Sequence, residues 1–424
     1  MLSNQKSRTR TLLAAGLFAV ASTEILPLVA ALASDEPPLD IPSETVLQFS
    51  VDPYADQDKI GMIKDGLAHL AAIRYEPDSF SSANSGYTKV YGDFCVYDAT
   101  LNKVDEPSLY PTIEDMMLTS DHCGDYTFAL PLDEVIAAVS SHDRNVRQEN
   151  IQVAVGGLMF HLGHAGAGIL SNVLATFERA LVVPEHPAIR EALFACDYIH
   201  SKFESVDCSA LLQKQLVEDV MALATRTSDE RITHIYVKFH AESAAYLSMV
   251  REIFPDVPWT FHSRDSDTVL SKSTQQSLTS CVLTRRQPSF LLAQKSNEYN
   301  IDLDGMSQED LCALYLSTLL DAATQEFEHS ETGMLIPYDQ LVEVDFITSV
   351  VLPHFGLQDE IDIDAAAVTT AVQESLSKKS NTRGVPGKKI LKWNADEEVV
   401  DVSDKVSAAN KLFMGHATTL FEGF

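Results

Sequence analysis

The stretch GLMFHLGHAGAGILSN, at residues 157–172, decides the fold that we expect for this chain. It starts as an apolar strand, turns through glycines at positions 163, 166 and 168, and continues as a helix that ends near Ala180. Backbone N–H groups in such a turn can point at a phosphate, at the positive end of the helix. The glycines could equally do no more than let the strand and the helix pack closely. The stretch matches neither G-x-x-x-x-G-K-S/T nor G-x-G-x-x-G.

The sequence around this stretch alternates between strand and helix candidates. The strand candidates are residues 157–161, 180–183, 232–239, 259–262 and 333–336. This alternation, with short connections, predicts an α/β fold with a central, mostly parallel sheet flanked by helices over residues 150–424. Residues 34–149 are expected to form an N-terminal extension or subdomain of uncertain class, with a helix around residues 132–139. Ser307 and Asp310 predict a cap for a helix over residues 308–327.

Four stretches resemble the sulfotransferase superfamily, and the chain looks like a divergent member. FHLGHAGAGILSN (160–172) is similar to the family's 5′-phosphosulfate loop, G-R/K-x-G-S-T-L-L, and FPDVPWTFHSRDSDTVLSKS (254–273) to its 3′-phosphate segment, R-D/E-P-x-x-V-x-x-S. YVKFHAESAAYLSMVREIFPDVPW (236–259) and PYDQLVEVDFITSVVLPHFGL (337–357) also look like the family. The resemblance covers roughly residues 148–421 and implies a P-loop NTPase-like sulfotransferase fold.

The resemblance also implies a set of site residues for the donor, 3′-phosphoadenylyl sulfate (PAPS). The loop residues that would wrap its 5′-phosphate are Gly163, Gly166, Ala167, Gly168 and Ile169. His164 stands where the family has the arginine or lysine that stabilises charge on the bridging oxygen, which makes it the catalytic candidate. Ala167 and Gly168 replace the family's serine and threonine, so two hydroxyl donors are lost.

The second signature places Arg264 on the 3′-phosphate, because a guanidinium fork binds phosphate through two parallel hydrogen bonds. Lys272 stands where the family has its serine, and Ser271 and Ser273 flank it as substitutes. The expected function is sulfuryl transfer to a hydroxyl or amine of a small-molecule or glycan acceptor, or a low-activity version of it. The alternative is a catalytically inactive protein of the same fold that acts as a binding or scaffold module.

Sulfuryl transfer needs a base for the acceptor's proton, and three residues follow predicted strands. His161, His240 and Glu185 lie near strand ends, where the active sites of open α/β sheets gather. The histidines could instead only end their strands, and Glu185 could cap the turn before His186. The sequence leaves the base unassigned.

Charge excludes one class of partner. The 61 acidic and 31 basic residues give a formal net charge of -30, which repels a polyanion, so we expect no nucleic-acid partner. A small phosphorylated donor is compatible with this charge, because a few backbone amides and one or two cations suffice to hold it.

The first 33 residues read as a secretory signal peptide or a signal anchor. Basic residues precede an apolar run at residues 12–21, and small residues suit cleavage after Ala21 or Ala33. An uncleaved type II anchor and a buried helix are the alternatives, and only the anchor gives the protein a membrane partner. We expect a secretory-pathway location, in the Golgi lumen or outside the cell.

The 6 cysteines form an even set in an oxidising compartment, which predicts one to three disulfides. Cys196 and Cys208, close in sequence, are the best candidate pair, although free buried thiols remain an alternative. No C-x-x-C pair occurs, so no metal site is expected. Asn300 starts a run that resembles a calcium loop, but Leu311 stands where the loop needs a bidentate glutamate.

Overall fold

A computed structural model describes residues 54–96 except 56, 127–146, 154–275 except 204–205, 290–357 and 404–414. Isolated residues are also described, at 112–113, 116–117, 123, 281, 366, 368–370 and 373. The predicted signal or anchor segment lies outside these ranges. Within them, no helix combines the length and the apolar character needed to cross a bilayer.

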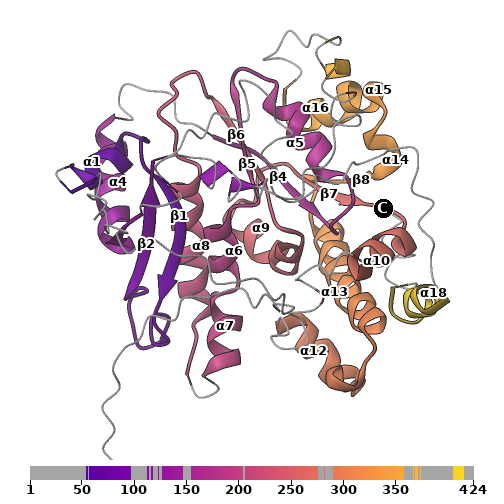
Figure 1. Cartoon of the computed structure of the whole chain (residues 1–424). Helices are drawn as coiled ribbons and strands as arrows, with labels where there is room; N and C mark the ends of the chain where they lie inside the picture. The colour runs from indigo at the N-terminus through magenta and orange to yellow at the C-terminus, as the bar shows by residue number, and fades with distance from the viewer. Residues whose placement is uncertain are drawn as a thin grey trace, which may run out of the picture. The chain divides into compact units, whose positions relative to one another are not determined.

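The centre of the fold is a five-stranded parallel sheet in the order β5-β6-β4-β7-β8 (Figure 1). Its strands are β4 (Ala154–His161), β5 (Ala180–Pro184), β6 (His234–Lys238), β7 (Trp259–Ser263) and β8 (Gly333–Pro337). Apolar and β-branched residues dominate these strands, as expected where both faces of a sheet are covered. The predicted α/β class and parallel sheet are therefore confirmed.

One face of the sheet packs against α5 (Ala167–Ala175) and a run of short helical turns near the chain's end. The turns are α14 (Tyr338–Leu341), α15 (Val344–Phe346), the π-helical η4 (Ile347–Val351) and α16 (Leu352–His354). Met159, Tyr236 and Phe355 belong to the buried cluster on this face. A Cβ at Gly157 would lie 2.4 Å from the ring of Phe355, so glycine permits this close packing. The chain after β8 is therefore a run of short helical pieces and not one continuous helix.

The opposite face packs against a second set of helices, which lie below the sheet in Figure 1. These are α6 (Pro187–Leu193), α7 (Ala195–Lys202), α8 (Ala210–Ala224), η2 (Ala241–Tyr246), α9 (Leu247–Ile253), α10 (Ser266–Gln275), α12 (Phe290–Tyr299) and α13 (Gln308–His329). Side chains alternate along each strand, so Phe160 and Phe261 face this second core while Met159 faces the first. Ser307 caps α13, because its Oγ accepts from the amide of Asp310 at 3.0 Å.

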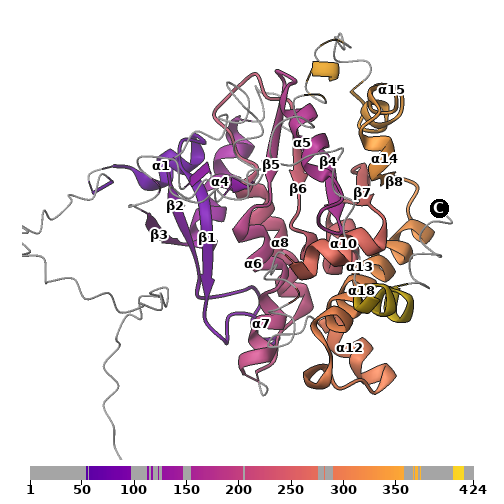
Figure 2. The same ribbon diagram turned by 45° about the vertical axis from the view of Figure 1, so that its right-hand side comes forward.

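The N-terminal region contains an antiparallel sheet in the order β1-β2-β3, which gives it the structural class that the sequence left open (Figure 2). Its strands are β1 (His69–Tyr75), β2 (Val90–Cys95) and β3 (Phe128–Pro131), with α1 (Lys59–Lys64) and α4 (Leu132–Val146) beside them. Glu191 of α6 accepts the amide of Ile73 at 3.0 Å, and His186 bonds the carbonyl of Leu70 at 3.0 Å. The apolar side chains of β1, β2, β3, α1 and α4 belong to the second core. A domain boundary near residue 150 stays a prediction.

Three disulfides link the six cysteines. They are Cys95–Cys123, Cys196–Cys208 and Cys281–Cys312. The second is the pair that the sequence favoured, and it joins α7 to the segment that leads into α8. Small helices α18 (Asp404–Ala409) and η5 (Asn410–Met414) pack against α13 and α10.

The strand order has a topological switch point between β4 and β7. The chain leaves β4 through α5 toward β5 on one side, and it leaves β7 toward β8 on the other. Ligands of open α/β sheets bind at such a switch point, outside the carboxyl ends of the strands. The glycine-rich turn and Arg264 lie on its two sides.

Candidate active site

The glycine-rich turn connects β4 to α5 through two left-handed glycines. Gly163 has a φ of 81° and Gly166, the N-cap of α5, has a φ of 83°. A Cβ on Gly166 would also lie 2.8 Å from Cδ2 of Tyr338. His164 adopts a φ of 50°, a conformation that costs energy for a residue with a Cβ and that clusters at functional sites.

The amides of this turn are not equivalent. The N–H of Gly163 donates to Nδ1 of His161 at 2.9 Å, and that of Ile169 donates to the carbonyl of Gly166 at 2.8 Å. Ala167 and Gly168 occupy the first turn of α5, where N–H groups have no intrahelical acceptor. Their amides bond to no residue within the described ranges. An anion at this turn would therefore be met first by Ala167 and Gly168, since Gly163 and Ile169 are already engaged.

Arg264, the first residue after β7, stacks on an aromatic ring. Its guanidinium carbon lies 4.1 Å from the ring centroid of Tyr338, and it forms no ion pair with any acidic residue that the structure describes. An arginine without an acidic partner in the described ranges stands out in a chain of net charge -30. Because Tyr338 also touches Gly166, one ring brings the glycine-rich turn and the predicted 3′-phosphate arginine together.

The other residues that the sequence predicts at the 3′-phosphate of PAPS are buried. Ser271 and Ser273 lie on α10 with 0% and 3% of their surface exposed, and Lys272 between them is also buried. The role of the two serines at the 3′-phosphate stays a prediction.

The three base candidates meet at one carboxylate. Lys238, at the end of β6, places Nζ 2.6 Å from Oε1 of Glu185. Nε2 of His161 lies 3.6 Å from the same oxygen, and Nδ1 of His240 lies 3.6 Å from Oε2. Gly163 lies beside Ala241, the residue after His240, so this cluster borders the glycine-rich turn. We call these four residues the Glu185 cluster.

Electrostatics fix the charge of the cluster. Burial alone would raise the pKa of Glu185, but the Lys238 ammonium, with His161 and His240, outweighs burial and holds that pKa below its usual range. Burial lowers the pKa of His240, against the opposing effect of Glu185. At neutral pH the cluster therefore contains an ionised Glu185 and a neutral His240 imidazole.

Hydrogen bonding distinguishes the two histidines. His161 has both nitrogens in use, because Nδ1 accepts from Gly163 while Nε2 donates to the carbonyl of Phe239 at 2.9 Å. In His240, Nδ1 faces Glu185, and the buried Nε2 has no hydrogen-bond partner in the described parts of the chain. His240 is thus the histidine whose second nitrogen can accept a proton.

Glu185 does not cap the turn that follows β5, so that alternative is wrong. The cap of α6 is His186, whose Nδ1 accepts from the amide of Ala188 at 3.2 Å. Glu185 instead has a φ of 46°, and its amide donates to the carbonyl of Lys238 at 2.7 Å. The strained backbone turns its carboxylate toward β6.

Sequence reasoning missed Lys238 and Tyr338. Lys238 is a lysine at the end of an apolar strand and two residues before His240, a spacing that puts both near one strand end. Tyr338 follows β8 directly, which is the equivalent position on another strand. Both follow or end a strand and lie in stretches that resemble the family, but neither belongs to the two phosphate-binding signatures.

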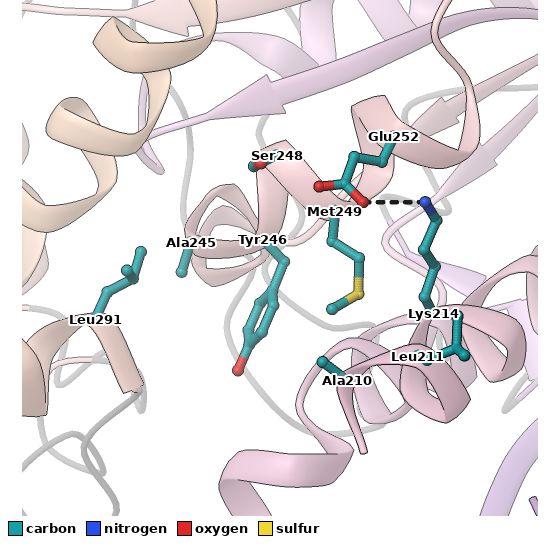
Figure 3. A pocket seen from close by; sticks show the side chains of 9 residues that line it. All are labelled: Ala210, Leu211, Lys214, Ala245, Tyr246, Ser248, Met249, Glu252 and Leu291. Carbon is teal, nitrogen blue, oxygen red and sulfur yellow. Dashed lines mark hydrogen bonds and ion pairs between the residues drawn. The ribbon is translucent and has the colours of Figure 1, made fainter. Parts of the chain in front are cut away.

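A separate cavity of about 410 Å³ lies between α8, α9 and α12 (Figure 3). Leu211, Met249 and the ring of Tyr246 form much of its wall, and Lys214 pairs with Glu252 at 3.0 Å on one side. None of the Glu185 cluster lines it. No group of three or more His, Cys, Asp or Glu side chains in the described ranges is arranged to hold a metal ion.

Comparison with solved structures gives likenesses of low sequence identity. A crystal structure of a sulfotransferase from Mycobacterium avium is similar over 67% of this chain and 81% of that chain, with 12% sequence identity and a TM-score of 0.34. No protein-family model and no curated protein sequence matches the chain.

Proposed function

We propose that this protein transfers a sulfuryl group from 3′-phosphoadenylyl sulfate to a hydroxyl or amine acceptor. The observation that carries the proposal is the Glu185 cluster. It provides a neutral imidazole whose Nε2 has no hydrogen-bond partner among the described residues, beside a turn whose Ala167 and Gly168 amides bond to no described residue. Arg264, on the other side of the switch point and without an acidic partner among the described residues, supports an anionic ligand, and the two sequence signatures support this particular one.

The turn and Arg264 would hold the two ends of the donor. The amides of Ala167 and Gly168, at the positive end of α5, suit the 5′-phosphate, and the Arg264 fork suits the 3′-phosphate. The donor supplies the activated sulfur. His164, in the same turn, would stabilise the charge that develops on the bridging oxygen when its imidazole is protonated.

His240 acts as the base in this proposal. Nε2 takes the proton from the acceptor hydroxyl as its oxygen bonds to sulfur, while the bond from sulfur to the 5′-phosphate oxygen breaks and adenosine 3′,5′-bisphosphate leaves. Glu185, kept ionised by Lys238, orients His240 through Nδ1 and stabilises the imidazolium that forms. Proton transfer of this kind contributes about 100- to 10,000-fold in rate.

The setting that we propose is the secretory pathway, with a small molecule or glycan as acceptor. The three disulfides support an oxidising compartment. The net charge of -30 argues against nucleic acid as a partner.

Calorimetry with adenosine 3′,5′-bisphosphate tests donor binding. We expect saturable binding that Arg264→Ala weakens and Arg231→Ala leaves unchanged. Arg231 is a matched control because it pairs with Asp229 at 2.8 Å, near the start of β6 and away from the carboxyl ends of the strands. Absence of binding at millimolar nucleotide, in a folded preparation, would refute the proposal.

Transfer of radiolabelled sulfate to a panel of a phenol, a monosaccharide and a hexosamine tests catalysis. His240→Ala should lower kcat by about 100-fold or more and leave nucleotide affinity unchanged, whereas the exposed His329→Ala should change neither. Nucleotide binding without turnover would favour the binding-module alternative. If the unmodified protein shows no turnover and the triple variant His164→Arg, Ala167→Ser, Gly168→Thr does, the three loop substitutions account for the loss of activity.

A further inference from the structure

Tyr338 stands between the two halves of the candidate donor site. It begins α14 directly after β8, and its ring is half-buried. One part of the ring lies against Gly166, where a Cβ would come within 2.8 Å of Cδ2 and 3.1 Å of Cε2. The Arg264 guanidinium covers the ring, 4.1 Å from its centroid.

We propose that Tyr338 is a positioning residue that holds Arg264 ready for an anion without neutralising it. This inference rests on the proposed function for the identity of the anion, but its physical content concerns Arg264 alone. The ring face attracts the guanidinium through its quadrupole and leaves the N–H groups at the rim of the plane free to donate.

The acidic residues beside Arg264 are directed elsewhere. Oδ1 of Asp265 accepts the amide of Thr268 at 2.9 Å, and Oδ1 of Asp267 accepts from the side chain of Asn410 at 2.7 Å. A carboxylate on Arg264 would orient it equally well, but it would compete with the ligand for the same donors. The aromatic ring therefore orients Arg264 without competing with the ligand for its N–H groups.

Preorganisation explains why such support matters. A free arginine side chain has many rotamers, and fixing them on binding costs conformational entropy. Tyr338 meets part of that cost in the unbound protein. Because the same ring contacts Gly166, it also fixes the position of Arg264 relative to the turn.

A pair of variants separates the ring from the hydroxyl. Tyr338→Phe keeps the ring face, and Tyr338→Leu removes it; Tyr338→Met serves as a second ring-free variant in case leucine does not fold. In calorimetry with adenosine 3′,5′-bisphosphate, we expect the ring-free variants to weaken affinity by about 2- to 30-fold. Phenylalanine should stay within about twofold of the unmodified protein.

A double-mutant comparison shows whether the effect passes through Arg264. In an Arg264→Ala background, Tyr338→Leu should cause no further loss of affinity. An equal loss in both backgrounds, or the same loss for phenylalanine as for leucine, overturns the inference.

A ligand-independent measurement keeps this inference distinct from the proposed function. Phenylglyoxal modifies arginine, and mass spectrometry of the peptide that contains Arg264 gives its rate. We expect faster modification in Tyr338→Leu than in Tyr338→Phe or the unmodified protein, because the ring covers one face of the guanidinium. If no variant binds nucleotide, the proposed function fails and this rate still decides the role of Tyr338. Equal rates in all three proteins refute it.

Discussion

Replacing Lys238 by methionine would leave the Glu185 carboxylate without the cation that faces it. Lys238 is 6% exposed and its Nζ lies 2.6 Å from Oε1, so both charges are largely shielded from water. At that distance, and with an effective dielectric constant of about 20, the attraction is on the order of 6 kcal/mol before the cost of desolvation. Breaking a buried pair by removing one partner typically costs about 3–5 kcal/mol.

The matched control is an ion pair on the surface. Lys214 and Glu252 lie 3.0 Å apart, with 32% and 63% of their side chains exposed. Exposed pairs contribute about 0–1 kcal/mol, so Lys214→Met should hardly change stability. The two ion pairs have similar distances and differ in burial, so the difference between the two variants measures the effect of burial on the pair.

Urea unfolding at pH 7 with the disulfides intact measures both effects. We expect Lys238→Met to lower the free energy of unfolding by about 3–5 kcal/mol, and Glu185→Gln in the same chain to restore part of that loss. The pKa of Glu185 should rise in Lys238→Met, because burial then acts without its main opposing charge. A loss below about 1 kcal/mol, comparable to that of Lys214→Met, would contradict the assignment of a buried, ionised Glu185.

Three further predictions concern acid, the turn and a disulfide. Burial lowers the pKa of His186 and of His262 to about 3. Since the unfolded value is about 6.5, their contribution to stability is present above about pH 6.5 and is lost as the pH falls toward 3, and His262→Gln should flatten the pH dependence of thermal unfolding in that window. In thermal unfolding, Gly166→Ala should destabilise the protein by about 1–3 kcal/mol, because Gly166 has a positive φ and its Cβ would collide with Tyr338. A Cβ at Gly168 meets nothing within 4 Å, so Gly168→Ala should be neutral or stabilising. Equal losses of stability in the two variants would refute the geometry of the turn. Removing the Cys196–Cys208 bridge by a Cys208→Ser change should cost about 3 kcal/mol in denaturant unfolding, and peptide mapping of the unreduced protein checks the pairing.

Local patterns predicted the sheet well and the site only in part. The strands that end at His161 and Ser263 are short apolar runs bounded by turn residues. Such runs can be recognised without knowing which strands pair with one another. The N-terminal sheet could not be predicted, because β2 and β3 pair across about 30 residues of weak pattern, and strand pairing is a tertiary event.

The site shows the same division. The sequence placed His161, His240 and Glu185 near predicted strand ends. The structure brings their side chains together, because parallel strands have their carboxyl ends at one edge of the sheet. The choice among them depends on which ring nitrogens are already bonded, and spacing along the chain carries no such information. The engagement of the Gly163 amide by His161 was hidden for the same reason.

The packing of Phe355 on Gly157 has a consequence for biosynthesis. One face of the central sheet is sealed by residues that the ribosome makes late, since Tyr236 is covered by Phe355, 119 positions further along the chain. Until those turns emerge, Met159 and Tyr236 form an apolar surface on a nascent chain, a condition that invites chaperone binding and aggregation. Premature termination before Phe355 would therefore leave a complete glycine-rich turn on a protein that quality control should recognise as unfinished.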